Sequence, residues 1–480
     1  MPKHFTYKSL DDLRADVAAR GLNIQFEDTI DRVLQPVQIG HRKIGNALGI
    51  QPMEGCDGDL DGTPGPLTYR RWERFGRGGS KLIWGEATAV DKDARANPRQ
   101  LFLHEKNVKQ FEDLAKKTRA GHRDVFGNDD DLLVGLQITH SGRYSFKKPY
   151  LVYHHPQVDQ RTYVDKSNGI LIDDDYPVVT DDYLEKLEDR FAAIAVLVEQ
   201  AGFDFIDLKQ CHTYLLSELL GARVREGKYG GSFENRTRFI RNVLEKINAK
   251  VRKDFIIASR INAYDGIPYR KNPVSGIGEP MPCDLPYKYS FGVDKHDPLR
   301  EDLTEVKQLL QILIDNNVKL VNVSMGSPYY NMHVGRPYEK PPVDGYESPE
   351  HPLEGVERQF RIAGELQQAF PKLPLVGTGY SWLQKFLVNA AESNIKNGRI
   401  SIASTGRGAI AYPDFVKDLQ KHGEMKRSKV CIAVSHCTNL MRSKHNELGQ
   451  FESGCVPRDP VYAKIFKESL KKQKKQKVDQ

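Results

Sequence analysis

Short β-branched and apolar runs alternate with amphipathic stretches along most of the chain, and this alternation restricts the fold more than any other feature. Eight runs have the length and composition of buried strands: 46–52, 81–90, 132–139, 204–209, 255–262, 319–324, 375–378 and 400–404. Stretches with the spacing of amphipathic helices lie between them, among them 180–201, 234–251, 301–316 and 353–370. Strands that alternate with helices build parallel sheets, so eight such units predict a (β/α)₈ barrel, the TIM-barrel class of α/β fold.

Three long segments interrupt the alternation, and each follows the carboxyl end of a predicted strand. They cover 143–177, 263–298 and 326–352, and tyrosine and proline are common in them. Barrel enzymes build their active sites from the loops at this end of the strands. We therefore expect long βα loops over a single site in a barrel domain at 1–421, followed by a C-terminal extension at 422–480.

The composition argues against several classes of protein. The 480 residues include no run of about 18 apolar residues, so no membrane span is expected. The N-terminus is charged from its first residues and has no apolar signal region. The six cysteines are scattered and do not have the spacing of a disulfide framework. These features predict a cytoplasmic protein with free thiols and no membrane partner, and they leave a homo-oligomer open.

Lysines near the end of the chain account for much of the formal net charge of +7. The basic tail contains Lys471, Lys472, Lys474, Lys475 and Lys477 with no aromatic residue between them. Basic charge alone supports only salt-sensitive, non-specific binding to polyanions. We expect a frayed, solvated terminus and no nucleic-acid partner, with a polyanion contact as the alternative.

The third predicted strand ends in polar residues at the expected barrel mouth. In the run Gly135-Leu-Gln-Ile-Thr-His140-Ser-Gly-Arg143, a period of two puts Gln137 and Thr139 on one side and His140 at the rim. A glutamine amide donates and accepts hydrogen bonds at once, which suits the pyrimidine edge of a flavin. A glutamine satisfied by neighbouring backbone groups is the alternative.

The fourth predicted strand and the segment after it carry the most specific pattern in the chain. The strand reads Ile206-Asp-Leu-Lys-Gln-Cys-His-Thr-Tyr-Leu-Leu216, and Tyr229-Gly-Gly-Ser-Phe-Glu-Asn-Arg236 lies downstream. Both resemble the old yellow enzyme family of flavin oxidoreductases, whose fourth strand reads close to E-I-H-x-x-(N/H)-x-Y-L-L and is followed by Y-G-G-S-x-E-N-R.

Two further segments extend this resemblance in the right order. The run from Gln137 to Arg143 resembles the family's Q-x-x-H-x-G-R, and Pro52-Met53 with the later run 78–87 resembles its first two strands. The match covers about 46 to 413. It is nearest to the branch that contains bacterial 2,4-dienoyl-CoA reductase and trimethylamine dehydrogenase.

The resemblance implies FMN as the cofactor and NADH or NADPH as a diffusible reductant. It assigns the flavin ring to Pro52, Met53, Ala87, Gln137 and Arg260. An arginine near the N1–C2=O end of the ring stabilises negative charge on the reduced flavin. For Arg260, an ordinary ion pair at the strand end is the alternative. His140 and Arg143 are expected to contact the substrate.

The phosphate of the cofactor is expected at strands seven and eight, where barrels frequently bind phosphate. These strands are followed by Gly377 and Gly379, and by Gly406 and Arg407. Glycines let backbone N–H groups approach phosphate oxygens, and Arg407 adds positive charge. Either glycine cluster alone is more often a simple turn.

Three residues after the fourth strand are the candidate catalytic groups. The family places a histidine, then an asparagine or histidine, on the carbonyl oxygen of the substrate, and Lys209 and His212 take those two places here. An ammonium and an imidazole N–H can still supply two donors. The alternative is that Lys209 only neutralises Asp207 on the same strand face. Tyr214 keeps the family's place for a proton donor to the α-carbon, a role that a phenol can fill; a core tyrosine is the alternative.

These features predict an ene-reductase-type enzyme, which reduces an activated carbon–carbon double bond in a small unsaturated molecule. The same flavin motifs also fit a dehydrogenase or demethylase that oxidises an amine or an acid. A flavin-free barrel lyase with Lys209 as a Schiff-base nucleophile is a second alternative, and a barrel with a vestigial site is a third. The tyrosines of the long loops favour an aromatic or apolar substrate, or they pack the loops together.

The C-terminal extension contains Cys431, Cys437 and Cys455. Relatives on the reductase branch follow the barrel with a four-cysteine iron–sulfur motif and then with nucleotide-binding domains. Val434 stands where a C-x₂-C pair needs its second thiolate, with His436 as a conceivable extra ligand, and such clusters normally take four cysteines. We therefore expect no metal, and electrons that come from diffusing NAD(P)H or from a partner protein.

Overall fold

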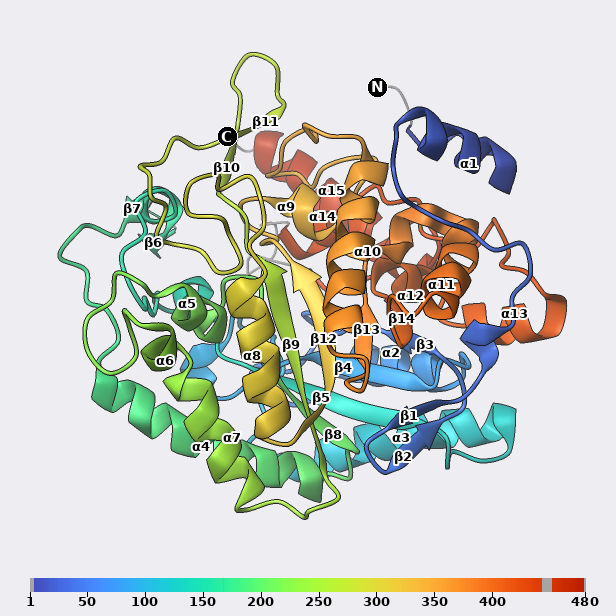
Figure 1. Ribbon diagram of the computed structural model, residues 1–480, viewed down its shortest axis with the longest axis horizontal. Helices are drawn as coiled ribbons and strands as arrows, with labels where there is room; N and C mark the ends of the chain where they lie inside the picture. Colours follow the sequence, from blue (N-terminus) through green and yellow to red (C-terminus); the bar gives the residue numbers. More distant parts are fainter. Residues whose placement is uncertain (1–3, 167, 443–450, 479–480) are drawn as a thin grey trace.

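The computed structural model describes residues 4–166, 168–442 and 451–478, and its centre is a closed barrel of parallel strands (Figure 1). In order around the barrel the strands are β3 Leu48–Ile50, β4 Leu82–Ala89, β5 Leu133–Thr139, β8 Phe205–Gln210, β9 Ile256–Tyr264, β12 Val318–Met325, β13 Leu375–Gly377 and β14 Ile402–Thr405. Every strand overlaps the run predicted for it, and each pairs in parallel with both neighbours. The predicted (β/α)₈ barrel is confirmed.

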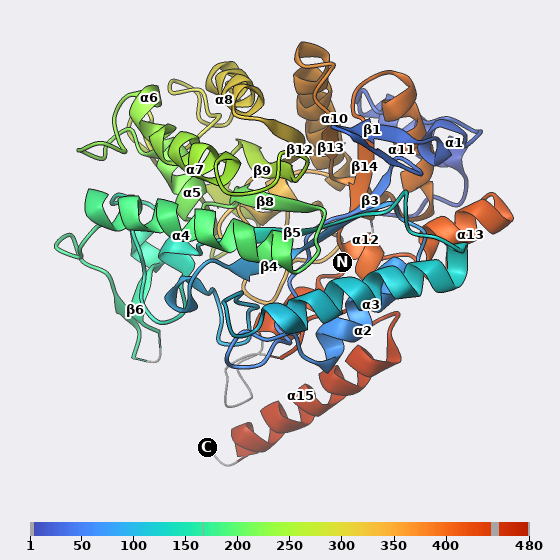
Figure 2. The same cartoon turned by 90° about the horizontal axis from the view of Figure 1, so that it is seen from below.

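Helices surround the barrel and cover its outer face (Figures 1 and 2). Up to the end of the barrel they are α1 Leu10–Ala19, α2 Pro66–Gly76, α3 Val108–Phe126, α4 Asp181–Gln200, α5 Leu215–Gly221, α6 Phe233–Arg236, α7 Arg238–Asn248, α8 Thr304–Asp315, α9 Met332–Gly335, α10 Pro352–Ala369, α11 Leu387–Lys396, α12 Arg407–Ala411 and α13 Phe415–His422. The helix expected over 234–251 is divided into α6 and α7 at Thr237. In the described parts of the chain, no helix is long and apolar enough to cross a membrane.

Large apolar side chains fill the amino-terminal half of the barrel. The cluster comprises Leu82, Trp84, Leu133, Phe205, Ile256, Ala258, Leu320, Val376 and Ile402. A hairpin of β1 Val37–Ile39 and β2 Arg42–Ile44 closes this end and adds Ile39 and Ile44 to the same cluster. Because this half is filled, polar chemistry inside the barrel is confined to the carboxyl ends of the strands.

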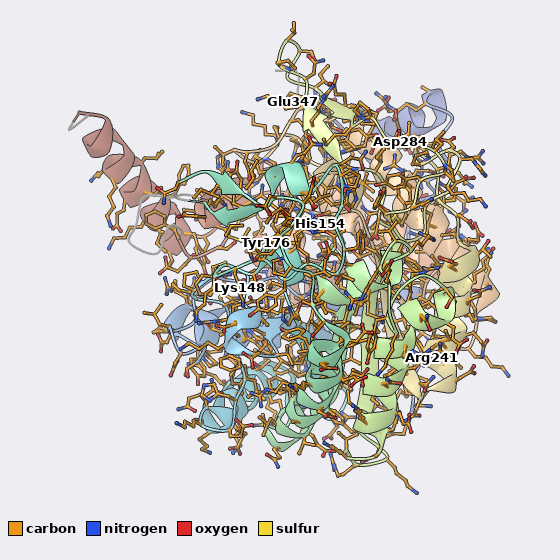
Figure 3. All side chains as sticks on the ribbon, turned by 90° about the vertical axis from the view of Figure 1, so that its left-hand side faces the viewer. Lys148, His154, Tyr176, Arg241, Asp284 and Glu347 are labelled. Atoms are coloured by element: carbon orange, nitrogen blue, oxygen red, sulfur yellow. The ribbon has the colours of Figure 1, made fainter. Side chains whose placement is uncertain are left out.

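The three long segments cover the carboxyl end of the barrel, and each has secondary structure of its own. They contain β6 Tyr163–Asp165 with β7 Ile170–Leu171, then β10 Tyr269–Lys271 with β11 Gly278–Pro280, and then α9. Figure 3 shows His154 beside Tyr176 in the first segment, where an imidazole nitrogen lies 2.9 Å from the Tyr176 carbonyl oxygen. The carbonyl of Glu347 in the third segment accepts a hydrogen bond from Gly278 N–H in the second at 2.9 Å. This hydrogen bond joins the second and third segments over the mouth of the barrel.

The chain beyond α13 folds back against the barrel. It contains α14 His436–Arg442 and α15 Pro460–Val478. Asp459, just before α15, accepts hydrogen bonds from Arg70 at 2.8 Å and from Arg74 at 2.6 Å, both on α2. Figure 2 shows α15 beside α2, with its far end running out from the body of the protein.

The basic tail differs from the prediction of a frayed terminus, because α15 is helical as far as Val478. Its first turns are anchored by Tyr462, which is buried, and by Ile465 and Phe466, which pack beside it. Lysine also has a favourable helix propensity, so the helix continues past these contacts. Lys471 and Lys472 are exposed, in keeping with a solvated tail.

A buried charge network fixes the segment that follows β3. Arg71 on α2 forms ion pairs with Asp57 and Glu86, and all three side chains are buried. The carboxylate of Glu86 also accepts hydrogen bonds from Gly55 N–H at 2.9 Å and from the Trp72 indole at 3.0 Å. The network therefore holds the turn that carries the residues just after β3 against α2.

Replacing Arg71 by Met should lower the free energy of unfolding by about 3–5 kcal/mol, because two buried carboxylates lose their cation. Arg77→Met, at the end of the same helix, removes a surface pair with Asp124 and should cost less than about 1 kcal/mol. Urea unfolding followed by circular dichroism measures both. Equal losses in the two variants would contradict the role of the network.

Candidate functional site

A polar layer lies directly above the apolar filling of the barrel. In the strand register, Lys209 on β8 stands opposite Arg260 on β9, and Arg260 stands opposite Asn322 on β12. Side chains alternate between the two faces of a strand, and Ala258, two residues before Arg260, belongs to the interior cluster. Lys209, Arg260 and Asn322 therefore face the barrel interior in one layer at the mouth.

Asp207 organises this layer from below. Its carboxylate accepts hydrogen bonds from Gln137 Nε2 at 2.6 Å, from Trp84 Nε1 at 2.7 Å and from the Arg260 backbone N–H at 2.6 Å. Burial raises the pKa of Asp207 to about 6, and these donors oppose the rise. Because the Gln137 amide turns its nitrogen toward Asp207, its oxygen is left to accept a hydrogen bond from a ligand.

The ammonium of Lys209 contacts the Tyr214 ring, whereas the alternative was an ion pair with Asp207. Both oxygens of Asp207 are taken by other donors, while Lys209 Nζ lies 3.6 Å from the centroid of the Tyr214 ring. An ammonium over a phenol ring is a cation–π contact. Burial lowers the pKa of Lys209 below its usual range, so this lysine releases its proton more readily than a surface lysine.

Tyr214 belongs to a group of three stacked or tilted phenols. Its hydroxyl oxygen lies 2.8 Å from that of Tyr329, and Tyr329 stacks on Tyr144 with ring centroids 3.8 Å apart. Burial raises the pKa of Tyr214 well above its usual value, with the neighbouring Tyr329 adding to the rise. Tyr214 is therefore protonated across the neutral range, as a proton donor must be.

The side chain of His212 also lies at the barrel mouth, and its backbone forms a strained turn. His212 and Thr213 have φ angles of 64° and 57°, a conformation that costs a non-glycine residue about 1–3 kcal/mol. His212 Nε2 lies 3.0 Å from Ser324 Oγ, which also accepts a hydrogen bond from Arg260 Nη2 at 3.3 Å. Burial and the charges of Arg260 and Lys209 lower the pKa of His212 well below its usual value, so the ring is neutral.

Glu54 is a further acid at the mouth that the sequence did not single out. Its carboxylate accepts a hydrogen bond from Asn97. Burial raises the pKa of Glu54, and the positive charge of Lys209 opposes the rise. The charge of Glu54 in turn contributes to the raised pKa values of Tyr214 and Tyr329. Glu54 thus belongs to the same electrostatic unit as the candidate catalytic groups.

The glycines expected to hold a phosphate lie at the ends of β13 and β14. Gly377 is the last residue of β13, Gly379 follows with a φ of +94°, and Gly406 precedes α12. A Cβ on Gly406 would lie 2.6 Å from Met53 Sδ, so a side chain there would require Met53 to move. Arg407 is buried, and one of its Nη atoms has no partner among the described residues.

The other predicted flavin residues converge on the same mouth. Pro52 is buried just after β3, and Ala87 on β4 is in register with Gln137 on β5. Arg260 is buried, and its Nε atom has no partner in the ranges that the structure describes. The set therefore draws on six of the barrel strands.

His140 and Arg143 are bound by protein groups in the wall of the site. His140 Nε2 lies 2.7 Å from the Tyr183 hydroxyl, and its Nδ1 accepts a hydrogen bond from the Gly142 backbone N–H at 3.0 Å. The guanidinium of Arg143 donates to Glu218 at 2.5 Å and makes further bonds to Asp159, Thr162 and the Tyr153 carbonyl. Their substrate contacts stay a prediction, since these polar atoms are already used.

Three residues of the mouth were missed from the sequence, namely Glu54, Ser324 and Arg336. Tyr329 was expected only as one of the loop tyrosines, without its contact to Tyr214. Glu54 directly follows Pro52-Met53 at a strand end, and this position was a usable signal. Ser324 likewise ends the sixth predicted strand. Tyr329 and Arg336 lie in the long segment after β12, where no periodicity indicates which side chains turn inward.

The three cysteines of the extension line one small cavity together with Arg407 and His436. Burial raises the pKa values of Cys431 and Cys455, so both are protonated thiols at neutral pH. Within the described ranges, no three His, Cys, Asp or Glu side chains are grouped closely enough to hold a metal ion.

The class of the protein follows from its sequence together with its barrel fold. The sequence model of the NADH:flavin oxidoreductase / NADH oxidase family matches residues 32–275, slightly more than half of the chain. The protein belongs to this family. Its members are flavin enzymes that use FMN and a nicotinamide, which agrees with the resemblance seen in the strand-end motifs.

Individual relatives are distant and most are longer. The chain is 24% identical over 447 residues to an NADH oxidase of Thermoanaerobacter brockii, covering 91% of this chain and 58% of the relative. A structure of 2-naphthoyl-CoA reductase with its ligand matches with a TM-score of 0.65 and 17% identity over 90% of this chain and 58% of that one. Histamine dehydrogenase from Rhizobium sp. 4-9 matches with a TM-score of 0.57 and 19% identity over 82% and 48%. The chain spans a little over half the length of the first curated relatives it matches.

Replacing Asp207 by Ala should lower the free energy of unfolding by about 3 kcal/mol or more, because three buried donors lose their acceptor. Asp207→Asn keeps one oxygen acceptor and should lose less than half as much. Guanidinium unfolding of both variants measures this difference. Wild-type stability in Asp207→Ala would show that the carboxylate is not the hub of the polar layer.

Proposed function

We propose that this chain is an FMN-dependent enzyme that reduces an activated carbon–carbon double bond with electrons from NADH or NADPH. The observation that carries the proposal is the contact between the Lys209 ammonium and the Tyr214 ring, 3.6 Å apart at the barrel mouth. An alkene conjugated to a carbonyl group needs a donor for its oxygen and an acid for its α-carbon. These two side chains offer both within one site.

The residues at the mouth fit FMN by the chemistry of their unpaired atoms. Arg260 Nε and an Nη atom of Arg407 are buried without a partner among the described residues, and buried cations without acceptors are costly. A phosphate and the electron-rich pyrimidine end of a flavin would supply those acceptors. Gln137 offers its amide oxygen to the ring, and Gly406 keeps the backbone open beside Met53.

FMN, when bound, would supply the redox chemistry, which is hydride transfer between the nicotinamide and the β-carbon of the substrate. Lys209 and His212 are the donors proposed for the substrate carbonyl oxygen, where negative charge develops. Tyr214 then gives its phenolic proton to the α-carbon, and the hydroxyl of Tyr329, 2.8 Å away, can replace that proton. Glu54 is a nearby acid from which the phenols can be reprotonated.

The amine-oxidising alternative fits this mouth less well. Aromatic rings that bind a cationic amine must be free to face it, but the ring of Tyr214 already faces the Lys209 ammonium. A third cation beside Lys209 and Arg260 would also meet like charge. The flavin-free lyase is disfavoured by membership in a flavin family.

Anaerobic mixing of the yellow protein with NADH, NADPH or an amine tests the direction of the reaction. The proposal expects one of the two nicotinamides to bleach the flavin and an enone or enoyl thioester to restore its colour. Bleaching by the amine, with no response to either nicotinamide, would reverse the proposed direction. A purified protein that binds no FMN would remove the proposal altogether.

Tyr214→Phe should separate the two half-reactions. Flavin reduction by the nicotinamide should stay near the wild-type rate, while reoxidation by the alkene slows by about 10²–10⁴-fold, the usual effect of losing a positioned acid. Stopped-flow absorbance measures both steps. Tyr229→Phe is the matched control, because its hydroxyl binds Glu188 at 2.7 Å, away from the mouth. Equal slowing of both steps in Tyr214→Phe would argue for a structural role.

The alkene step should also lose rate at high pH, because Lys209 stabilises the substrate oxyanion only while it carries its proton. Since burial lowers the pKa of Lys209, kcat/KM should fall at a pH below the ordinary lysine value. Lys209→Met should lower kcat/KM at neutral pH and abolish this alkaline limb. An unchanged alkaline limb in Lys209→Met would assign it to another group.

A further inference from the structure

Three arginines from separate segments gather beside the proposed phosphate end of the site. Arg336 follows α9 in the segment after β12, Arg407 begins α12, and Arg442 ends α14. Burial lowers the pKa of Arg336, and the positive charges of Arg442 and Arg407 lower it further. The guanidinium group of Arg336 is therefore close enough to the other two to be repelled by both.

Within the described residues, hydrogen-bond partners differ among the three arginines, and Arg336 and Arg407 keep unpaired nitrogens. Arg442 pairs with Asp344 and donates to the Pro328 carbonyl at 2.8 Å. Arg336 donates from Nη1 to Thr438 Oγ1 at 2.7 Å, but its Nε and Nη2 are buried with no partner among the described residues. Arg407 likewise has Nη1 buried and unpaired within those ranges.

Arg336 and Arg407, the two incompletely paired arginines, meet at one stretch of backbone. Arg407 Nη2 donates to the carbonyl of Pro337 at 2.6 Å, and Pro337 is the residue directly after Arg336. Buried donors on two neighbouring cations cost free energy unless an anion accepts from them. A phosphate monoester presents three oxygens and up to two negative charges, which suits two guanidinium groups at once.

We propose that Arg336 and Arg407 together clamp one phosphate group, and that this group is the phosphate of FMN. The inference rests on the proposed function, because it takes the flavin to lie in this barrel mouth. Arg336 thus becomes a cofactor-binding residue supplied by the loop after β12, in addition to the strand-end residues. An anionic group of the substrate is the other source of the same chemistry.

Flavin-free full-length protein titrated with FMN and with riboflavin, which lacks the phosphate, distinguishes these sources. Arg336→Gln should raise the Kd for FMN by about 10- to 100-fold, the effect of losing hydrogen bonds to a charged group. Its Kd for riboflavin should stay as in the wild type. Fluorescence quenching of the flavin measures both constants without any turnover.

Arg358→Gln is the matched control, because Arg358 is paired with Glu350; it should leave both Kd values unchanged. Circular dichroism and thermal unfolding of the flavin-free Arg336→Gln variant check its fold. This variant should be at least as stable as the wild type, since it removes a buried cation beside two others. A marked loss of its stability would contradict the unpaired state of Arg336.

The remaining outcomes separate the two claims. An unchanged FMN affinity in Arg336→Gln overturns the inference, and an accompanying rise in KM for an anionic substrate would transfer Arg336 to the substrate. Equal weakening of FMN and riboflavin would place Arg336 against the flavin ring and also overturn the phosphate clamp. Wild-type protein that binds neither flavin would refute the proposed function itself, and with it the clamp.

Discussion

Buried positive charge without enough acceptors from the protein is the constraint on which the mouth of this barrel depends. Lys209 and Arg260 stand side by side on neighbouring strands, and Arg336 and Arg407 follow from the loop and strand beyond. Within the described residues, Arg260, Arg336 and Arg407 have buried nitrogens without a hydrogen-bond partner. The ammonium of Lys209 faces the ring of Tyr214 instead. Such an arrangement is costly in the free protein and becomes favourable when an electron-rich, phosphorylated ligand enters. In the proposed account these charges select a flavin nucleotide, which the shape of the barrel alone does not do, because barrels host many reactions.

Asp207 makes this concentration of charge compatible with a folded barrel. It lies between the apolar filling and the charged layer, and its three donors come from three different strands. It thereby fixes the Gln137 amide and the backbone of Arg260, while Lys209 is left to contact Tyr214. The strained backbone at His212 places the second donor over Ser324. Strain of this kind at a barrel mouth is typical of a functional site, where the surrounding structure holds an unfavourable conformation in place.

Structural elements that appear in the sequence as a short periodic pattern were predictable. All eight strands appear in the sequence as apolar runs. Motifs at their carboxyl ends point to Gln137, Arg260, Arg407 and Tyr214, whose roles stay predictions. Residues in the long loops were not predictable in this way, because their inward direction depends on packing between loops far apart in sequence. Arg336 is one example and the contact of Tyr329 with Tyr214 is another, and Glu54 was overlooked although it follows Met53. The helical tail was also misjudged, since the apolar contacts of Tyr462 that anchor it lie several residues before the lysines.

A crystal structure of the protein with bound FMN tests the central claim most directly. The account predicts a flavin ring within hydrogen-bond distance of the Gln137 amide oxygen and Arg260, and a phosphate oxygen about 2.7–3.2 Å from the unpaired nitrogens of Arg407 and Arg336. It also predicts an open face of the ring below Tyr214 and Lys209, where a substrate can lie. Flavin bound elsewhere, with these guanidinium groups still unpaired, would contradict the claim that buried charge at the barrel mouth selects the cofactor.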